Sequence, residues 1–233
     1  MKNTLTEGLR AMSVSADDTM IEQLSGYGRE LLRVNQTTNL TAIREEIPAA
    51  QLHFLDSAQL LQYADFAGKS IIDVGSGAGF PGVPLAVLCP TASVTVIDSV
   101  GKKMDFVKQA CAAQRIENVR AVWGRAEEQK AFREKFDFAV SRAVADLAVL
   151  AELCLPLVKV GGTFFAMKRV DCDEELSRAN GAVRMLGGRV KEVLRYTIPG
   201  TETEHAVIRI EKETATLPQY PRRYAVIVKR PLK

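Results

Sequence analysis

The residues best placed to do chemistry lie in a glycine-rich stretch that follows a short apolar run, residues 71–72, and an acid, Asp73. An apolar segment, residues 83–88, comes next, so the pattern predicts a strand, a tight turn and a helix. The glycines of the turn are Gly75, Gly77, Gly79 and Gly82. Glycine adopts backbone angles closed to other residues and leaves no side chain between a ligand and the backbone. The turn is therefore a candidate ligand site, and Pro81 and Pro84 are tolerated in the first turn of the helix.

The glycine spacing alone leaves the ligand open. The first three glycines form G-x-G-x-G, whereas counting from Gly77 to Gly82 gives the G-x-G-x-x-G of a dinucleotide site. No G-x-x-x-x-G-K-[ST] occurs, so a P-loop phosphate cradle is not indicated. A carboxylate at Asp73 suits the ammonium and sulfonium of S-adenosylmethionine and would repel a pyrophosphate. We therefore expect Asp73 and Gly77 in an S-adenosylmethionine site, against the alternative of a glycine-rich loop without a ligand.

A second acid, Asp98, supports the same interpretation. It ends the β-branched run of residues 94–98, about 20 residues beyond the glycines, where an acid meets ribose hydroxyls in nucleoside-binding α/β folds. Its carboxylate would accept hydrogen bonds from the 2′- and 3′-hydroxyls. By itself, Asp98 is equally compatible with an ordinary turn residue at the end of a strand.

The rest of the chain predicts the elements that position these residues. Strands are expected at residues 94–98, 118–122, 136–140 and 162–167, with helices after Asp98 and at 147–158 and 174–186, and an antiparallel pair at 190–198 and 205–210. This order predicts an α/β fold with a mainly parallel sheet and helices on both faces. Ligands in such folds bind at the carboxyl ends of the strands. The residues expected at those ends are Asp73, Asp98, Ala126, Glu127, Arg142 and Lys168.

The first part of the chain has a different character. Residues 1–65 have helical periodicity, with a break at 36–41 and a second helix expected at 48–61. We interpret residues 1–65 as a helical cap over the cofactor and residues 66–233 as the S-adenosylmethionine-binding domain.

Composition narrows the possible classes. The 233 residues contain 47% hydrophobic residues, enough for a real core, and the net charge of +3 marks no global nucleic-acid-binding field. Residues 178–233 hold twelve Lys/Arg against five Asp/Glu, which is compatible with a polyanionic partner. The four cysteines form no C-x-x-C pair, and no signal peptide or membrane-spanning run of about 18 apolar residues is evident. We expect a cytoplasmic monomer without a disulfide framework or a metal site.

Several motifs together are more specific than the glycine turn. They are Asn39-Leu-Thr41, His53-Phe-Leu-Asp-Ser57, residues 73–84, Asp98-Ser99 with Lys102-Lys103, and Ser141-Arg-Ala143. With them the chain resembles the ribosomal RNA small subunit methyltransferase G family, also called glucose-inhibited division protein B, over roughly residues 24–168. The resemblance implies a Rossmann-like S-adenosylmethionine-dependent fold that methylates N7 of one guanine in 16S rRNA. It implies cofactor contacts at Gly75, Phe80, Ala126, Glu127 and Arg142, and a partner that is 16S rRNA or the 30S subunit. Residues 221–228 are more apolar than the basic, Pro- and Gly-rich tails of the family.

The residues also bear on the reaction type. Guanine N7 carries a lone pair and no proton, so its methylation needs positioning rather than a general base. The chain has only two histidines and no Cys–His pairing, and we predict no catalytic side chain. The i, i+3 pair of His53 and Asp56 is interpreted as a helix-surface hydrogen bond in preference to a metal pair. Two other functions remain as alternatives: a small-molecule methyltransferase, and a nucleotide-binding regulatory module without catalysis.

Overall fold

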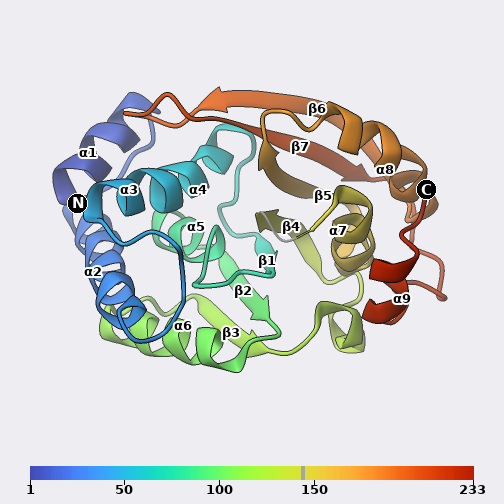
Figure 1. The fold of residues 1–233 in the computed structure, drawn as a ribbon, viewed down its shortest axis with the longest axis horizontal. Helices are drawn as coiled ribbons and strands as arrows, with labels where there is room; N and C mark the ends of the chain where they lie inside the picture. The colour runs from blue at the N-terminus through green and yellow to red at the C-terminus, as the bar shows by residue number, and fades with distance from the viewer. Residues whose placement is uncertain (143–144) are drawn as a thin grey trace.

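The computed structural model describes residues 1–142 and 145–233, and one seven-stranded sheet forms its centre (Figure 1). The strand order is β3-β2-β1-β4-β5-β7-β6. The strands are β1 (Ser70–Val74), β2 (Ser93–Asp98), β3 (Val119–Trp123), β4 (Phe136–Arg142), β5 (Val158–Arg169), β6 (Gly188–Thr197) and β7 (Glu204–Lys212). β1 to β5 pair in parallel, and β7 runs antiparallel to β5 and β6. The predicted mainly parallel sheet with a final antiparallel pair is confirmed. Ala143 of the third motif lies outside the described residues.

The strand register brings the predicted site residues to one edge. Val74 pairs with Ile97 on β2, and Asp98 pairs with Trp123 on β3. On the other side of β1, Asp73 pairs with Val140 near the end of β4. Because the pairs are parallel, the segments that follow these four strands all leave the sheet at the same edge.

Helices cover both faces of the sheet (Figure 1). The α-helices are α1 (Lys2–Ala11), α2 (Asp18–Asn35), α3 (Glu46–Ala49), α4 (Asp56–Ala58), α5 (Gly82–Leu88), α6 (Gly101–Ala113), α7 (Leu147–Cys154), α8 (Asp173–Met185) and α9 (Tyr224–Lys229). A wide π-helical turn at Ala50–Leu55 and 3₁₀ turns at Gln59–Gln62, Ala126–Glu128, Lys130–Phe132 and Leu155–Leu157 complete the helical elements. Helices α1, α2, α4, α5 and α6 share one buried apolar cluster with their face of the sheet, and α7 to α9 share the second.

One predicted helix is too long. The helix expected at 147–158 ends at Cys154, a 3₁₀ turn follows, and Val158 already begins β5. Pro156 explains the early end, because proline has no N–H for an internal helical hydrogen bond and clashes with the preceding turn.

The N-terminal helices are fastened to the glycine turn by aromatic residues. Tyr27 of α2 has its ring centroid 5.5 Å from that of Phe106 and 6.1 Å from that of Phe80, and Phe54 lies 5.1 Å from Phe80. The Tyr27 hydroxyl donates a 2.8 Å hydrogen bond to the carbonyl of Ala78 within the turn. The cap and the sheet thus share one core, and a domain boundary at 65/66 stays a prediction.

Candidate functional site

The turn after β1 takes left-handed backbone angles at three glycines. The φ angles are +71° at Gly75, +58° at Gly77 and +92° at Gly79. Since L-residues with a Cβ rarely adopt this region, the sequence needs glycine here to reverse the chain tightly between strand and helix. The amides of Gly75 and Ser76 donate to the carbonyl of Ile97 at 2.9 and 3.2 Å, which ties the turn to the end of β2.

The glycines of the turn meet different surroundings. A Cβ on Gly79 would lie 2.6 Å from Val83 Cγ2 and 2.7 Å from the Tyr27 hydroxyl, so packing excludes any side chain there. A Cβ on Gly77 would have only Lys103 Nζ within reach, at 4.0 Å. Gly77 therefore borders open space, as expected of a ligand-facing position.

Asp73, at the end of β1, is hydrogen-bonded to the start of α5 on the other side of the turn. Its side chain is fully buried, and one carboxylate oxygen accepts a 2.7 Å hydrogen bond from the amide of Gly82 at the start of α5. Burial raises the pKa of Asp73 to about 7, against the lowering effects of the Gly82 amide and the Arg142 guanidinium. Asp73 lines neither of the cavities described below, so its predicted contact with the cofactor cation stays a prediction.

Asp98 lies at the ligand-facing edge. Its carboxylate accepts hydrogen bonds from the amides of Gly77 at 3.0 Å and Val100 at 2.9 Å. One acid thus joins the glycine turn to the segment that follows β2. Asp98 also lines a cavity, which suits the predicted ribose contact.

Two cavities open at the carboxyl edge of the sheet. The smaller, of about 390 Å³, is lined by Val74, Gly75, Ile97, Asp98, Ser99, Lys103, Gly124, Arg125, Ala126, Glu127, Arg142, Leu153 and Tyr224. The larger, of about 860 Å³, includes Leu40, Thr41, His53, Gly75, Gly77, Phe80, Arg142, Lys168 and His205 in its lining. Both volumes lie in the range of small-molecule sites. The two cavities share Gly75 and Arg142, and together they contain every predicted site residue except Asp73.

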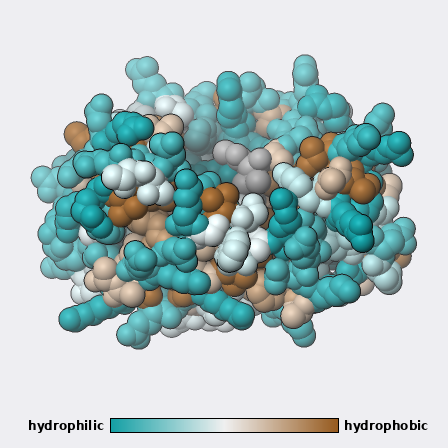
Figure 2. Space-filling view, turned by 60° about the horizontal axis from the view of Figure 1, so that its bottom comes forward, coloured by the Kyte–Doolittle hydropathy of each residue, from teal (hydrophilic) through white to brown (hydrophobic). Residues whose placement is uncertain are grey.

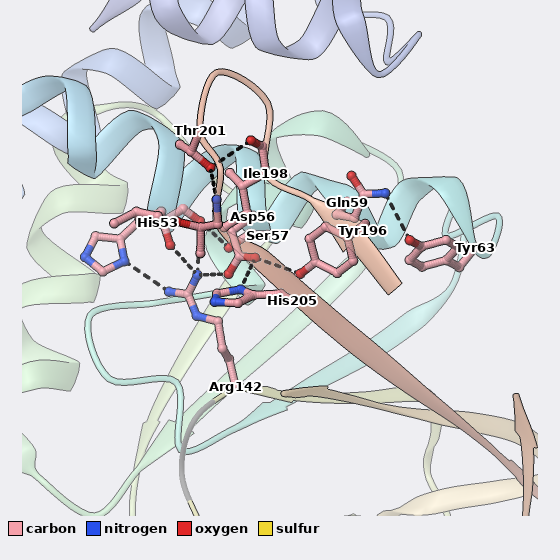
Figure 3. A network of polar contacts seen from close by, with 12 residues as sticks. His53, Asp56, Ser57, Gln59, Tyr63, Arg142, Tyr196, Ile198, Thr201 and His205 are labelled. Atoms are coloured by element: carbon pink, nitrogen blue, oxygen red, sulfur yellow. Dashed lines mark hydrogen bonds and ion pairs between the residues drawn. The ribbon is translucent and has the colours of Figure 1, made fainter. Parts of the chain in front are cut away.

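Arg142 stands between the two cavities and is held from the cap side (Figure 3). Its Nη1 donates to Asp56 Oδ2 and to the carbonyl of Leu52, at 2.8 and 2.9 Å, and its Nη2 lies 3.1 Å from His53 Nδ1. Its guanidinium carbon lies 5.5 Å from the ring centroid of Phe80. The orientation of Arg142 therefore depends on residues about 90 positions earlier in the chain.

His53 joins this arginine to the loop after α2. Its Nε2 lies 2.8 Å from the Thr41 hydroxyl, and its ring stacks on Phe80 at 4.7 Å with an angle of 18° between the planes. Burial and, second to it, the Arg142 charge lower the pKa of His53 to about 3, against the raising effect of the Asp56 carboxylate. His53 is therefore a neutral, flat wall of the larger cavity at neutral pH.

Asp56 is the fully buried centre of the network. Besides Arg142, it accepts hydrogen bonds from the Tyr196 hydroxyl at 2.7 Å and contacts His205 Nδ1 at 2.8 Å (Figure 3). Burial alone would raise the pKa of Asp56, but the His205 hydrogen bond and the Arg142 charge hold it below its usual 3.8. The prediction that His53 and Asp56 form a helix-surface pair is wrong: His53 lies in the π-helical turn and Asp56 begins α4, and each side chain binds partners on other elements.

The known proteins to which this chain is similar agree with this geometry. A sequence profile for rRNA small subunit methyltransferase G matches residues 20–205. The protein of that name from Alkaliphilus oremlandii (strain OhILAs) is 43% identical over 238 residues, which cover 100% of this chain and 99% of the relative. The one from Alkaliphilus metalliredigens (strain QYMF) is 41% identical over 237 residues, with the same coverage. The chain belongs to the ribosomal RNA small subunit methyltransferase G family.

Among solved structures, M. jannaschii TYW2 in complex with AdoMet has a similar fold. The TM-score is 0.54 at 12% identity, and the match covers 67% of this chain and 74% of that chain. Such low identity shows the fold alone, which is the Rossmann-like fold of S-adenosylmethionine-dependent methyltransferases. The family profile ends at residue 205, so α9 and its Tyr224, which lines the smaller cavity, lie beyond the matched range.

Two buried polar atoms in the cavities show whether the site suits S-adenosylmethionine, the methyl donor. Glu127 Oε1 in the smaller cavity and Ser76 Oγ in the larger have no hydrogen-bond partner among the described residues, and Glu127 Oε1 lies 3.9 Å from Arg125 Nη1. Burial also raises the pKa of Glu127. Since buried polar groups are normally satisfied, these atoms fit a ligand that brings hydroxyl and amino donors, as S-adenosylmethionine does.

The described residues also bear on two other kinds of feature, a metal site and a membrane-spanning helix. They contain no group of three or more His, Cys, Asp or Glu side chains that could hold a metal ion. Across residues 1–142 and 145–233, no helix has the length and apolarity needed to cross a membrane.

Half of the basic residues of the segment 178–233 are paired with carboxylates within the protein. Six of its twelve cations have carboxylate partners within 4.0 Å: Arg178, Arg189, Lys191, Arg195, Arg209 and Arg222. Lys212 is buried and donates to backbone carbonyls at 2.8 and 3.0 Å. The excess is therefore a weaker sign of a polyanionic partner than the sequence indicated.

Proposed function

We propose that this chain transfers a methyl group from S-adenosylmethionine to N7 of a specific guanine in 16S rRNA. The observation that carries the proposal is the meeting of two cavities at Gly75 and Arg142. One has the acids and backbone of a nucleoside site, and the other is more than twice as large and is walled by cap residues. Family membership supports both the reaction and its substrate.

In this proposal the smaller cavity holds the nucleoside of the cofactor. Asp98, already fixed by two backbone amides, and Glu127, with its free buried oxygen, accept the ribose hydroxyls. The left-handed turn at Gly75 and Gly77 lets the cofactor approach the backbone. S-adenosylmethionine supplies an activated methyl group on a sulfonium.

The larger cavity receives the target guanine. His53 and Phe80 present stacked rings, and single RNA bases are commonly recognised by stacking on such side chains. Glu174 and Glu175 line the same cavity; Glu175 already pairs with Lys168 at 2.6 Å, and the exposed carboxylate of Glu174 is suited to the cationic product. Because guanine N7 has no proton to lose and His53 is neutral, the residues of the site orient the base and take no proton from it.

The proposed function also implies a partner and a place of action. The substrate is 16S rRNA, free or in the 30S subunit, and the enzyme acts as a cytoplasmic monomer. Figure 2 supports a polar partner, because hydrophilic side chains cover most of the face it shows and hydrophobic residues appear only in small groups.

The test is methyl transfer from labelled S-adenosylmethionine to 30S subunits and to protein-free 16S rRNA, followed by nucleoside analysis. We expect one 7-methylguanine per 16S rRNA. Label confined to small molecules would indicate a small-molecule methyltransferase. Cofactor binding without any transfer would indicate a regulatory module, and either outcome would contradict the proposal.

A further inference from the structure

Glu152 is a buried acid that the proposed reaction does not use. It lies in α7 among apolar side chains, and its own side chain is fully buried. It accepts three hydrogen bonds from Arg222: from the backbone N and Nε to one oxygen, both at 2.8 Å, and from Nη2 to the other at 2.5 Å. Burying a charged carboxylate costs free energy unless a partner charge and hydrogen bonds compensate it. The contact with Glu152 therefore fixes the position of Arg222.

The chain around Arg222 is fastened on both sides. Before it, Arg133 Nη1 donates a 2.7 Å hydrogen bond to the carbonyl of Tyr220. After it, the fully buried side chain of Ile227 packs in the same apolar cluster as α7, and Arg222 Nη1 donates to the carbonyl of Arg230 at 3.0 Å. We call residues 220–230 the C-terminal strap.

The strap carries Tyr224 to the smaller cavity. The guanidinium carbon of Arg125 lies 4.7 Å from the ring centroid of Tyr224, and both residues line that cavity. Arg125 also faces Glu127 at 3.9 Å. Tyr224 remains 37% exposed, so part of its ring is accessible to a ligand.

We propose that Tyr224, held by the C-terminal strap, forms a wall of the adenine site of the cofactor. This inference rests on the proposed function, because it takes the ligand to be an adenine nucleoside. With Asp98 and Glu127 assigned to the ribose, the apolar side chains left to line the base site are those of Val74, Ile97, Ala126, Leu153 and Tyr224. A flat base stacked on an aromatic ring gains about 1–3 kcal/mol, and among the described residues of that lining Tyr224 alone has an aromatic ring.

The test compares binding of S-adenosylhomocysteine by titration calorimetry in the full chain and its variants. Tyr224→Ala should weaken binding about 5- to 150-fold, the equivalent of that stacking energy, and Tyr224→Phe should bind nearly as the unmodified chain does. Val228→Ala is the matched control: Val228 is exposed on the same helix and does not line the cavity, so binding should be unchanged.

A second variant tests the strap itself. Arg222→Ala should lower the affinity as Tyr224→Ala does, while thermal melting and circular dichroism report whether the fold persists. Unchanged affinity in Tyr224→Ala, with Asp98→Ala still impaired, would overturn the adenine wall and leave the proposed function standing. Loss of rRNA methylation with unchanged affinity would assign Tyr224 to the RNA instead. An unmodified chain that binds no S-adenosylhomocysteine would defeat the proposed function.

Discussion

The two cavities at the carboxyl edge of the sheet are built in different ways. The smaller one is framed by strand ends and by backbone amides that Asp98 holds in place. The larger one is lined by residues held around one carboxylate, that of buried Asp56, which binds side chains from β4, β6 and β7. Backbone geometry thus shapes the proposed cofactor site, whereas one ion pair and its hydrogen bonds hold the proposed substrate site.

The largest expected effect is on the side-chain-built cavity. Asp56→Ala leaves Arg142 without its partner at 2.8 Å, and breaking a buried pair typically costs about 3–5 kcal/mol. We expect a loss of that order in the free energy of unfolding, measured by urea denaturation. Glu213→Ala is the control, because Glu213 and Arg189 form an exposed pair of the kind worth at most about 1 kcal/mol. Equal losses in the two variants would mean that Asp56 does not organise the cavity.

The next effect concerns the backbone-built cavity. Gly77→Val should still fold, because a Cβ at this left-handed position costs only about 1–2 kcal/mol. It should lose cofactor binding, because the valine side chain enters the open space beside Lys103. Gly79→Val should instead lose cooperative folding, since Val83 and Tyr27 already occupy the space. Calorimetry with S-adenosylhomocysteine and a melting curve separate the two. Normal binding by Gly77→Val would remove the turn from the site.

A smaller loss is expected at the ribose. Asp98→Ala should weaken S-adenosylmethionine binding by about 1–3 kcal/mol, the range for hydrogen bonds to a charged group. Titration calorimetry measures the affinity. An affinity equal to that of the unmodified chain would mean that Asp98 only fixes the turn and does not contact the ribose.

A last effect, comparable to that at Asp98, is a pH dependence at Asp73. Its pKa of about 7 lies above the usual 3.8, so the folded state binds the proton more tightly and stability falls as pH rises between these values. Asp73→Asn removes this loss, and the stability of the variant relative to the unmodified chain should improve from pH 5 to pH 8. Urea denaturation at both pH values measures it. A relative stability that is unchanged or worsens would show that the Asp73 carboxyl group has no raised pKa.

The difference between the two cavities also explains which parts of the site could be predicted from the sequence. The glycine turn, Asp98 and the strand ends follow from local pattern and from the rule that parallel strands end at one edge. The partners of Asp56 do not, because Tyr196 and His205 lie 140 and 149 residues away and arrive only through the insertion of β7 between β5 and β6. The i, i+3 spacing of His53 and Asp56 was misleading because a π-helical turn changes which side chains face each other.

Tyr224 shows a further limit of local pattern. Its apolar surroundings, residues 221–228, indicated only a departure from the usual tail of the family. The one available signal was Glu152, an acid within the apolar run of α7 that requires a cationic partner. Which of the many Lys and Arg residues supplies it cannot be read without the fold.

The most direct test of the central claim, positioning without a general base, is the pH profile of single-turnover methyl transfer to 30S subunits from pH 6 to 9. With the pKa of His53 near 3, no protonation change of that residue falls in this window, and guanine N7 has no proton to lose. We predict no rising limb of unit slope that depends on His53: His53→Ala lowers the rate by the same factor at every pH, and any effect of Asp73, whose pKa of about 7 lies in this window, is the same in both chains. A rising limb of unit slope in the unmodified chain that disappears in His53→Ala, with residual activity at every pH, would contradict the account and make His53 the base.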